Sequence, residues 1–180
     1  MSKTALLVMD VQRSVLTRFP DPEYLPRLAK VIDTARAADV PVIYVVVGFR
    51  DGFPEVSPNN KIFGRLASAA ISFGGDSSAI PDEIAPKPGE IVVTKKRVSA
   101  FAGSDLEMVL RAQGIDSLVL TGIATHGVVL STVRQAADLD YRLTVLADCC
   151  LDADPEVHRV LTEKVFPVQA DVVDSTEWHG

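Results

Sequence analysis

Short apolar runs alternate along the chain with stretches whose apolar residues recur at helical spacing. The runs are typical of strands buried in a parallel sheet. They occupy 5–9, 41–47, 90–94, 118–120 and 142–146, and a short last strand is expected over 168–173. Helical spacing covers 21–39, 104–113, 128–138 and 154–165. Strands that alternate with helices through short connections predict a three-layer α/β domain with a mostly parallel sheet.

Three of the expected helices begin with recognisable capping sequences. Asp21-Pro22 and Asp154-Pro155 each combine a capping aspartate with a proline in the first turn. The sequence SDLE at 104–107 fits a capping box, in which a serine and a glutamate satisfy N–H groups at the helix start reciprocally.

Residues 48–89 form a long segment rich in glycine and proline, with a helical piece expected over 61–70. A segment of this kind over the carboxyl edge of a sheet often covers a site or makes a subunit contact. A plain surface excursion is the alternative, and the sequence leaves both interpretations open.

Length and charge limit the class of protein. A chain of 180 residues with 47% hydrophobic residues fits one globular domain over 1–180. The net charge of -6 argues against nucleic acid or an anionic membrane surface as a partner. No apolar run approaches the ~20 residues that span a bilayer, and the N-terminus has no signal-peptide pattern.

The cysteine and glycine patterns argue against disulfides, metals and nucleotide cofactors. Cys149 and Cys150 are the only cysteines, and adjacent cysteines rarely pair, so the expected compartment is a reducing cytoplasm. The three histidines are widely spaced and there is no CxxC, so a zinc site has no support. Neither GxGxxG after the first strand nor GxxxxGK[ST] is present, and no cofactor is therefore expected.

Candidate chemistry lies where three of the expected strands end. Asp10 follows the first strand, Lys95 follows the third, and the small-residue turn at 121–127 joins the fourth strand to a helix. Such a turn puts backbone N–H groups at the carboxyl edge of the sheet, where open α/β folds place ligands. The structural alternatives are a capping role for Asp10, a solvated cluster at 95–97 and an ordinary strand–helix connection.

Four motifs in this order resemble the isochorismatase-like hydrolases, a superfamily that includes nicotinamidases and N-carbamoyl amidases. They are VMDVQ at 8–12, KKRVSAFAGSDL at 95–106, LVLTGIATHGVVLST at 118–132 and YRLTVLADCC at 141–150. The resemblance covers nearly the whole chain. It implies a six-stranded parallel sheet of order 3-2-1-4-5-6 and a homo-oligomer.

The chain departs from the amidases of this superfamily at their nucleophile. The resemblance matches Asp10 and Lys95 to an Asp–Lys–Cys triad, but Val128 stands where the cysteine is expected. Valine has no nucleophilic atom, and covalent amide hydrolysis needs a thiolate. Cys149 and Cys150 follow the next strand and are expected to be small buried residues. A standard cysteine amidase is therefore rejected.

Isochorismatases proper carry glycine at this position and hydrolyse a vinyl ether without a covalent intermediate. The resemblance then implies that Asp10 is the general acid and Lys95 its electrostatic partner. Burial would raise the pKa of Asp10 and Lys95 would lower it, and the sequence does not decide between them. Lys95 could instead hold a substrate carboxylate together with Arg97. Val128 is bulkier than glycine, so isochorismate itself is not expected to fit.

The turn after the fourth strand supplies the remaining expected site residues. The resemblance implies a cis Ile123–Ala124 peptide bond and an oxyanion hole from the N–H groups of Ala124 and Val128. Thr125 and His126 are expected beside the substrate. His126 either donates to a substrate oxygen or activates water, or is a partly exposed turn histidine near a subunit boundary.

Gln12 is expected to support the same pocket from the segment that follows Asp10. The metal ligands of nicotinamidases, an aspartate and a pair of histidines after the second strand, have no match in 48–60, so no metal is expected.

The function expected from these residues is Cys-independent hydrolysis of a small, carboxylated molecule. The alternative is a catalytically silent family member that binds a small anion or acts as an oligomeric interaction module. A third interpretation is that amidase activity was lost recently, with Val128 replacing the nucleophile.

Overall fold

A six-stranded, all-parallel sheet forms the centre of the computed structural model, which describes residues 3–68 and 78–180. The strand order is β3-β2-β1-β4-β5-β6, which confirms the expected fold class. The strands are β1 Thr4–Met9, β2 Val42–Val47, β3 Ile91–Lys95, β4 Ser117–Ile123, β5 Arg142–Leu151 and β6 Asp171–Val173.

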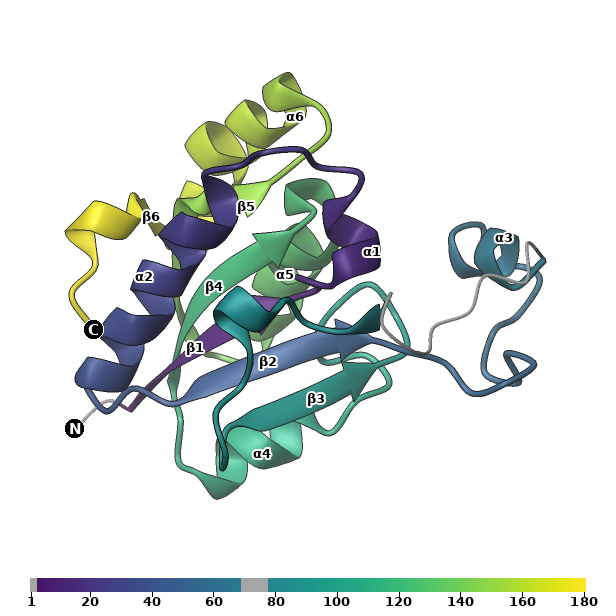
Figure 1. The fold of residues 1–180 in the computed structure, drawn as a ribbon, viewed down its shortest axis with the longest axis horizontal. Helices are drawn as coiled ribbons and strands as arrows, with labels where there is room; N and C mark the ends of the chain where they lie inside the picture. The colour runs from purple at the N-terminus through teal and green to yellow at the C-terminus, as the bar shows by residue number, and fades with distance from the viewer. Residues whose placement is uncertain (1–2, 69–77) are drawn as a thin grey trace.

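Helices cover both faces of the sheet (Figure 1). The α-helices are α1 Arg13–Leu16, α2 Tyr24–Ala37, α3 Phe63–Ser68, α4 Leu106–Ala112, α5 Leu130–Asp138 and α6 Pro155–Val160. Shorter turns are η2 Asp82–Ile84, η3 Thr125–Val129, η4 Leu161–Val165, η5 Phe166–Val168 and η6 Ser175–Glu177, of which η3 and η4 are π-helical. No helix in the described part of the chain is long and apolar enough to cross a membrane.

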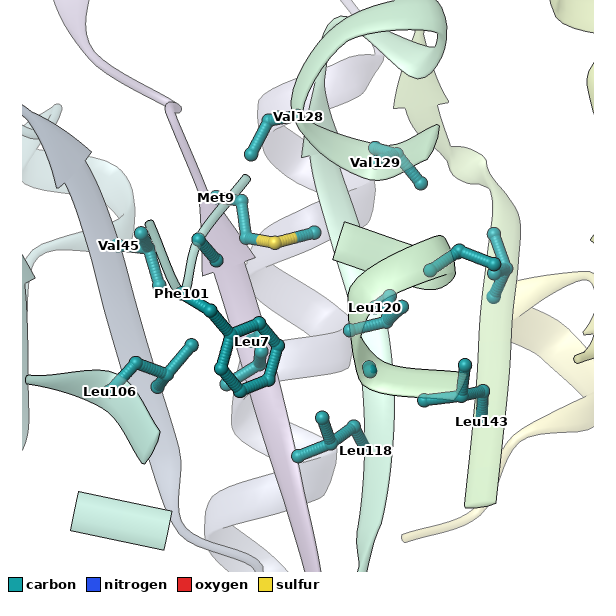
Figure 2. Packing of buried hydrophobic residues seen from close by; sticks show 14 of the residues in the cluster. Leu7, Met9, Val45, Phe101, Leu106, Leu118, Leu120, Val128, Val129 and Leu143 are labelled. Atoms are coloured by element: carbon teal, nitrogen blue, oxygen red, sulfur yellow. The ribbon is translucent and has the colours of Figure 1, made fainter. Parts of the chain in front are cut away.

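The two faces of the sheet have separate hydrophobic cores because side chains alternate along each strand. Leu7 and Met9 of β1 pack in the core beneath α4 and α5, whereas Leu6 and Val8 pack in the core beneath α2. Figure 2 shows the first of these cores, with Val128 beside Met9 at the carboxyl end of the sheet. The carboxyl ends of β1 and β4 are therefore fixed from both sides.

Two of the expected helix starts differ in the structure. The capping box at 104–107 does not form: the Ser104 hydroxyl donates to the Ala100 carbonyl at 2.6 Å, and α4 begins at Leu106 with Asp105 as its N-cap. The helix expected from 21 begins at Tyr24, because Asp21 accepts the Glu23 N–H in a local turn before it. Asp154 caps α6 as predicted.

Two further predictions concern where strand β5 ends and the helical piece at 61–70. Strand β5 continues to Leu151, so Cys149 and Cys150 lie within it, because the strand resumes pairing with β4 beyond an irregularity and Cys150 pairs with Gly122. The helical piece expected over 61–70 is present as α3, and its last two residues lie outside the described part of the chain.

Candidate active site

Asp10 lies at the carboxyl end of β1, where the chain leaves the sheet. Its backbone N–H donates to the Val45 carbonyl of β2 at 2.8 Å, and its φ of 58° then turns the chain in the left-handed region. Aspartate tolerates this region better than most residues do. The side chain consequently stays at the edge of the sheet, and the residue is only 8% exposed.

Lys95 is the last residue of β3, and β2 separates it from β1. Its long side chain nevertheless brings Nζ to 2.9 Å from Asp10 Oδ2. The same ammonium donates to the carbonyls of Arg97 at 2.8 Å and Val98 at 3.1 Å. An ammonium has three N–H donors, so these acceptors account for all of them. Lys95 is therefore committed to Asp10 and the adjacent loop.

The Asp10 carboxyl has one satisfied and one unsatisfied oxygen. Oδ2 pairs with Lys95, whereas Oδ1 is buried and makes no hydrogen bond to any residue in the described ranges. Burial raises the pKa of Asp10 from 3.8 to about 6, and this effect outweighs the charge and hydrogen bond of Lys95, which lower it. A useful fraction of Asp10 is thus protonated near neutral pH, as a general acid requires.

The turn after β4 brings backbone groups to the same edge of the sheet. The Ile123–Ala124 peptide bond is cis, the geometry expected from the resemblance, and the π-helical turn η3 follows directly and leads into α5. Val128 lies in this turn and is 2% exposed, packed into the core next to Met9 (Figure 2). The position that the resemblance assigns to a nucleophilic cysteine is therefore filled by an apolar side chain.

A cavity of about 410 Å³ joins these elements at the carboxyl ends of β1, β2, β3 and β4. Figure 1 shows α3 beyond the ends of β2 and β3, on the excursion that follows β2. Phe63 and Leu66 of α3, and Ile62 directly before it, line the same cavity. The described residues lining it are Asp10, Ser14, Val15, Arg18, Phe19, Val47, Ile62, Phe63, Leu66, Lys95, Val98, Ile123, Ala124, His126, Gly127 and Val128.

Five of the eight site residues expected from the sequence meet at this cavity. They are Asp10, Lys95, Ala124, His126 and Val128. The helical part of the segment 48–89 also contributes to it, which favours the interpretation that this segment covers a site.

The structure does not place the other three expected residues among the described lining of the cavity. The Gln12 side chain links the segment after β1 to the end of β2 and to Ser78. Its amide oxygen accepts the Val47 N–H at 3.0 Å, and its amide NH₂ donates to the Ser78 carbonyl at 2.9 Å. Arg97 donates to the Glu55 carbonyl at 2.8 Å, and the Thr125 hydroxyl lies 2.9 Å from His158 Nδ1. Each of these three side chains is therefore engaged in hydrogen bonds with other residues of the protein.

Arg18 lines the cavity and was missed by the sequence reasoning. It follows α1, is exposed, and forms no ion pair with residues 3–68 or 78–180. The only signal in the sequence is an arginine eight positions after Asp10, and nothing in that spacing says that the chain folds back over the sheet edge. Arg18 leaves a guanidinium available for an anionic group of a ligand.

Neither cysteine is placed to act as a nucleophile at the cavity. Cys149 and Cys150 are 0% and 2% exposed, and neither lines the cavity among the residues described. Burial raises the pKa of the Cys149 thiol to about 12 and raises the pKa of Cys150 further, so both remain inert thiols at neutral pH. The described ranges also contain no group of three His, Cys, Asp or Glu side chains that could hold a metal ion.

Known proteins are similar to this chain in both sequence and fold. The family described as Isochorismatase domain matches residues 4–177. Ureidoacrylate amidohydrolase RutB of Stutzerimonas stutzeri is 38% identical over 179 residues, covering 86% of this chain and 72% of that protein. An uncharacterized isochorismatase family protein, YwoC of Bacillus subtilis, is 32% identical, covering 92% of this chain and 86% of its own length.

Solved structures of related proteins have a similar fold. N-carbamoylsarcosine amidase from Thermoplasma acidophilum superposes with a TM-score of 0.79 at 34% identity, over 99% of both chains. An isochorismatase family protein from Desulfovibrio vulgaris superposes with a TM-score of 0.85 at 25% identity, covering 98% of this chain and 96% of that one. The chain therefore belongs to the isochorismatase domain family, as an isochorismatase-like hydrolase.

Proposed function

We propose that this protein hydrolyses a small, carboxylated molecule without a cysteine nucleophile. Asp10 is the general acid–base group and Lys95 its electrostatic partner. The N–H groups of Ala124 and Val128 form the oxyanion hole. The observation that carries the proposal is the Asp10 carboxyl, whose Oδ2 is held by Lys95 while the buried Oδ1 is left without a partner among the described residues at the cavity.

An enol ether illustrates the chemistry that these groups support. Protonated Asp10 gives its proton to the carbon of the C=C bond, and the π electrons form the new C–H bond. The oxocarbenium ion that results is attacked by water, which loses one proton to give a hemiketal. As the hemiketal collapses, its leaving oxygen gains a proton and its hydroxyl gives one back to the Asp10 carboxylate, so that a carbonyl product and an alcohol are released. Lys95 stabilises the Asp10 carboxylate formed in the first step. No bond to residue 128 is needed, which suits valine at that position.

The charge and shape of the cavity support a small anionic substrate. Its walls are largely apolar side chains, and Arg18 stands among them with no ion pair in the described ranges. A guanidinium in such a place favours a carboxylate, which it can bind through two hydrogen bonds. The names of two relatives, ureidoacrylate amidohydrolase and N-carbamoylsarcosine amidase, describe enzymes of small carboxylated molecules.

A hydrolysis screen of wild type and Asp10→Asn tests the proposal. The panel contains isochorismate and related enol ethers, ureidoacrylate and other N-carbamoyl compounds, primary amides and simple esters. Turnover of at least one compound by wild type is expected, with a loss of about 10²-fold or more in Asp10→Asn, the scale of a lost acid–base group.

Asp39→Asn is the matched control. Asp39 is an exposed aspartate that shares the left-handed backbone of Asp10, with φ of 56°, so this variant should keep wild-type turnover. Circular dichroism checks that each variant is folded. Turnover by folded Asp10→Asn at the wild-type rate, or no turnover of any compound by wild type, would overturn the proposal; the latter result favours a silent, anion-binding member of the family.

We further propose a homo-oligomer, which the resemblance to this family supports. Light scattering of the purified protein should give a multiple of the 19.4 kDa chain mass. A mass of a single chain at micromolar concentration would contradict it.

A further inference from the structure

A second acid–base pair lies at the cavity, formed by His126 and Asp152. His126 Nδ1 and Asp152 Oδ2 are 2.7 Å apart, and the same oxygen accepts the His126 backbone N–H at 2.8 Å. The other carboxylate oxygen accepts the Asp154 N–H at 3.3 Å. The two residues meet because Ile123 of β4 pairs with Leu151 of β5, so the segments that follow these strands leave the sheet side by side.

Asp152 is buried and hydrogen-bonded so that it holds the His126 imidazole in one orientation. Its side chain is 2% exposed, whereas that of His126 is 58% exposed. Burial opposes ionisation of Asp152, but the hydrogen bonds from the His126 backbone and ring and from Asp154 prevail and lower its pKa. An ionised carboxylate only accepts hydrogen bonds, so Nδ1 of a neutral His126 must carry the proton. Nε2 then has a free lone pair.

His126 lines the cavity that also holds Asp10, and Nε2 makes no hydrogen bond with any side chain in the described ranges. Nearby His158 does not compete for the role: burial lowers its pKa, and its Nδ1 is occupied by the Thr125 hydroxyl. The remaining charged groups at the cavity are Lys95, which is fully engaged, and the cationic Arg18.

We propose that His126 is a further catalytic residue, the base that activates water, and that Asp152 is the positioning residue that fixes its tautomer. This inference rests on the proposed function, in which water must be deprotonated as it attacks and Asp10 acts as the acid.

The step balances in protons and electrons. As the water oxygen forms its bond to the electrophilic carbon, one O–H bond breaks and the proton passes to Nε2 of His126. The imidazolium that forms carries protons on both nitrogens and is stabilised by Asp152. It returns the Nε2 proton to the leaving oxygen when the hydrated intermediate collapses, and the hydroxyl proton of that intermediate passes to the Asp10 carboxylate, which regains its acidic form. The neutral Nδ1–H form is then restored.

The test uses chemical rescue of the full-length protein on the panel compound that wild type turns over fastest. His126→Gly should lose about 10²-fold or more in kcat, and added imidazole should restore part of it, because the exposed ring leaves an open space. The backbone N–H to Asp152 remains in this variant, so the turn keeps its anchor. Imidazole should not rescue Asp10→Asn. His179→Gln, which changes an exposed histidine near the C-terminus, should keep wild-type turnover.

The positioning role of Asp152 is tested by measuring which nitrogen of His126 carries the proton. Asp152→Ala removes the oxygen that accepts Nδ1–H, so the ring is released to the Nε2–H form that a neutral histidine favours in water. Nitrogen-15 spectra should show the Nδ1–H form in wild type and the Nε2–H form in the variant, together with a loss of kcat comparable to that of His126→Gly.

The outcomes separate this inference from the proposed function. Loss of turnover in Asp10→Asn, together with less than a twofold change in His126→Gly and Asp152→Ala, would overturn the dyad and leave Asp10 in place. An impaired His126→Gly that imidazole does not rescue, or a wild-type His126 in the Nε2–H form, would also overturn it. Wild-type turnover in Asp10→Asn would instead contradict the proposed function.

Discussion

At the residue scale, the site depends on how each charged group is paired. Lys95 has an acceptor for every N–H of its ammonium, and Arg97 points its guanidinium at backbone carbonyls. Both were candidates for holding a substrate carboxylate, but Lys95 has no N–H left for one and Arg97 is not among the described residues that line the cavity. Arg18 is the cation at the cavity without an ion pair in the described ranges. Substrate charge should therefore be recognised from the segment after α1.

Replacing Arg18 tests this assignment. Arg18→Gln should raise KM for a carboxylated substrate about 10-fold or more, since a hydrogen bond to a charged group contributes about 1.5–3 kcal/mol, with little change in kcat. The methyl ester of the same compound should be insensitive to the substitution. Steady-state kinetics on the acid and the ester give both values.

Arg13→Gln is the matched control for Arg18. Arg13 lies in α1, pairs with Asp82 at 3.1 Å, and is not among the described residues that line the cavity. An equal increase in KM for acid and ester in Arg18→Gln, or the same increase in Arg13→Gln, would show that substrate charge is not read by Arg18.

At the element scale, the site needs β1 and β4 to approach closely where both strands end. Gly122 pairs with Met9, and a Cβ on Gly122 would overlap the Met9 carbonyl oxygen and lie 2.9 Å from the Met9 Cβ. Its φ of 145° also disfavours a side chain. Asp10 and Ala124 follow these two positions closely, so this contact sets the distance between the carboxylate and the turn.

Gly122→Ala should lower the free energy of unfolding by about 3–4 kcal/mol, in the range of severe core substitutions. Urea denaturation followed by circular dichroism measures it. Gly114→Ala separates the backbone effect from the clash, since Gly114 has φ of 67° but an open space around its Cβ position; about 1–2 kcal/mol is expected there, the cost of left-handed backbone. Equal losses in the two variants would contradict the role given to the contact with Met9.

Elements with strong local signals could be predicted from the sequence, and their exact ends could not. The apolar runs located β1, β2 and β3 within one residue, and Asp154 caps α6 as its sequence indicates. The capping box at 104–107 was wrong because Ser104 bonds to Ala100, a contact made by the fold of the preceding loop. Strand β5 was predicted too short because its last residues depend on pairing with β4.

At the scale of the whole molecule, parallel strands brought the predicted strand-end residues together. Asp10, Lys95 and the turn after β4 follow separate strands, and the sheet order places all three at one edge. Arg18 and the apolar residues of α3, which line the cavity, and Asp152, which contacts His126, could not be assigned in the same way, because their positions depend on loops whose paths are set by tertiary contacts. The sequence also could not decide the pKa of Asp10, which depends on burial and on the partner of each oxygen.

The most direct measurement of the central claim is the pH dependence of kcat/KM for wild type and Asp10→Asn on the same compound. Because the pKa of Asp10 is raised to about 6, its acidic form is lost as the pH rises through that value. We expect kcat/KM of wild type to fall about tenfold per pH unit well above pH 6, and we expect Asp10→Asn to be slow and to lack this fall. A wild-type profile that is flat or rises through pH 6, or an Asp10→Asn variant with the wild-type profile, would contradict an Asp10 general acid.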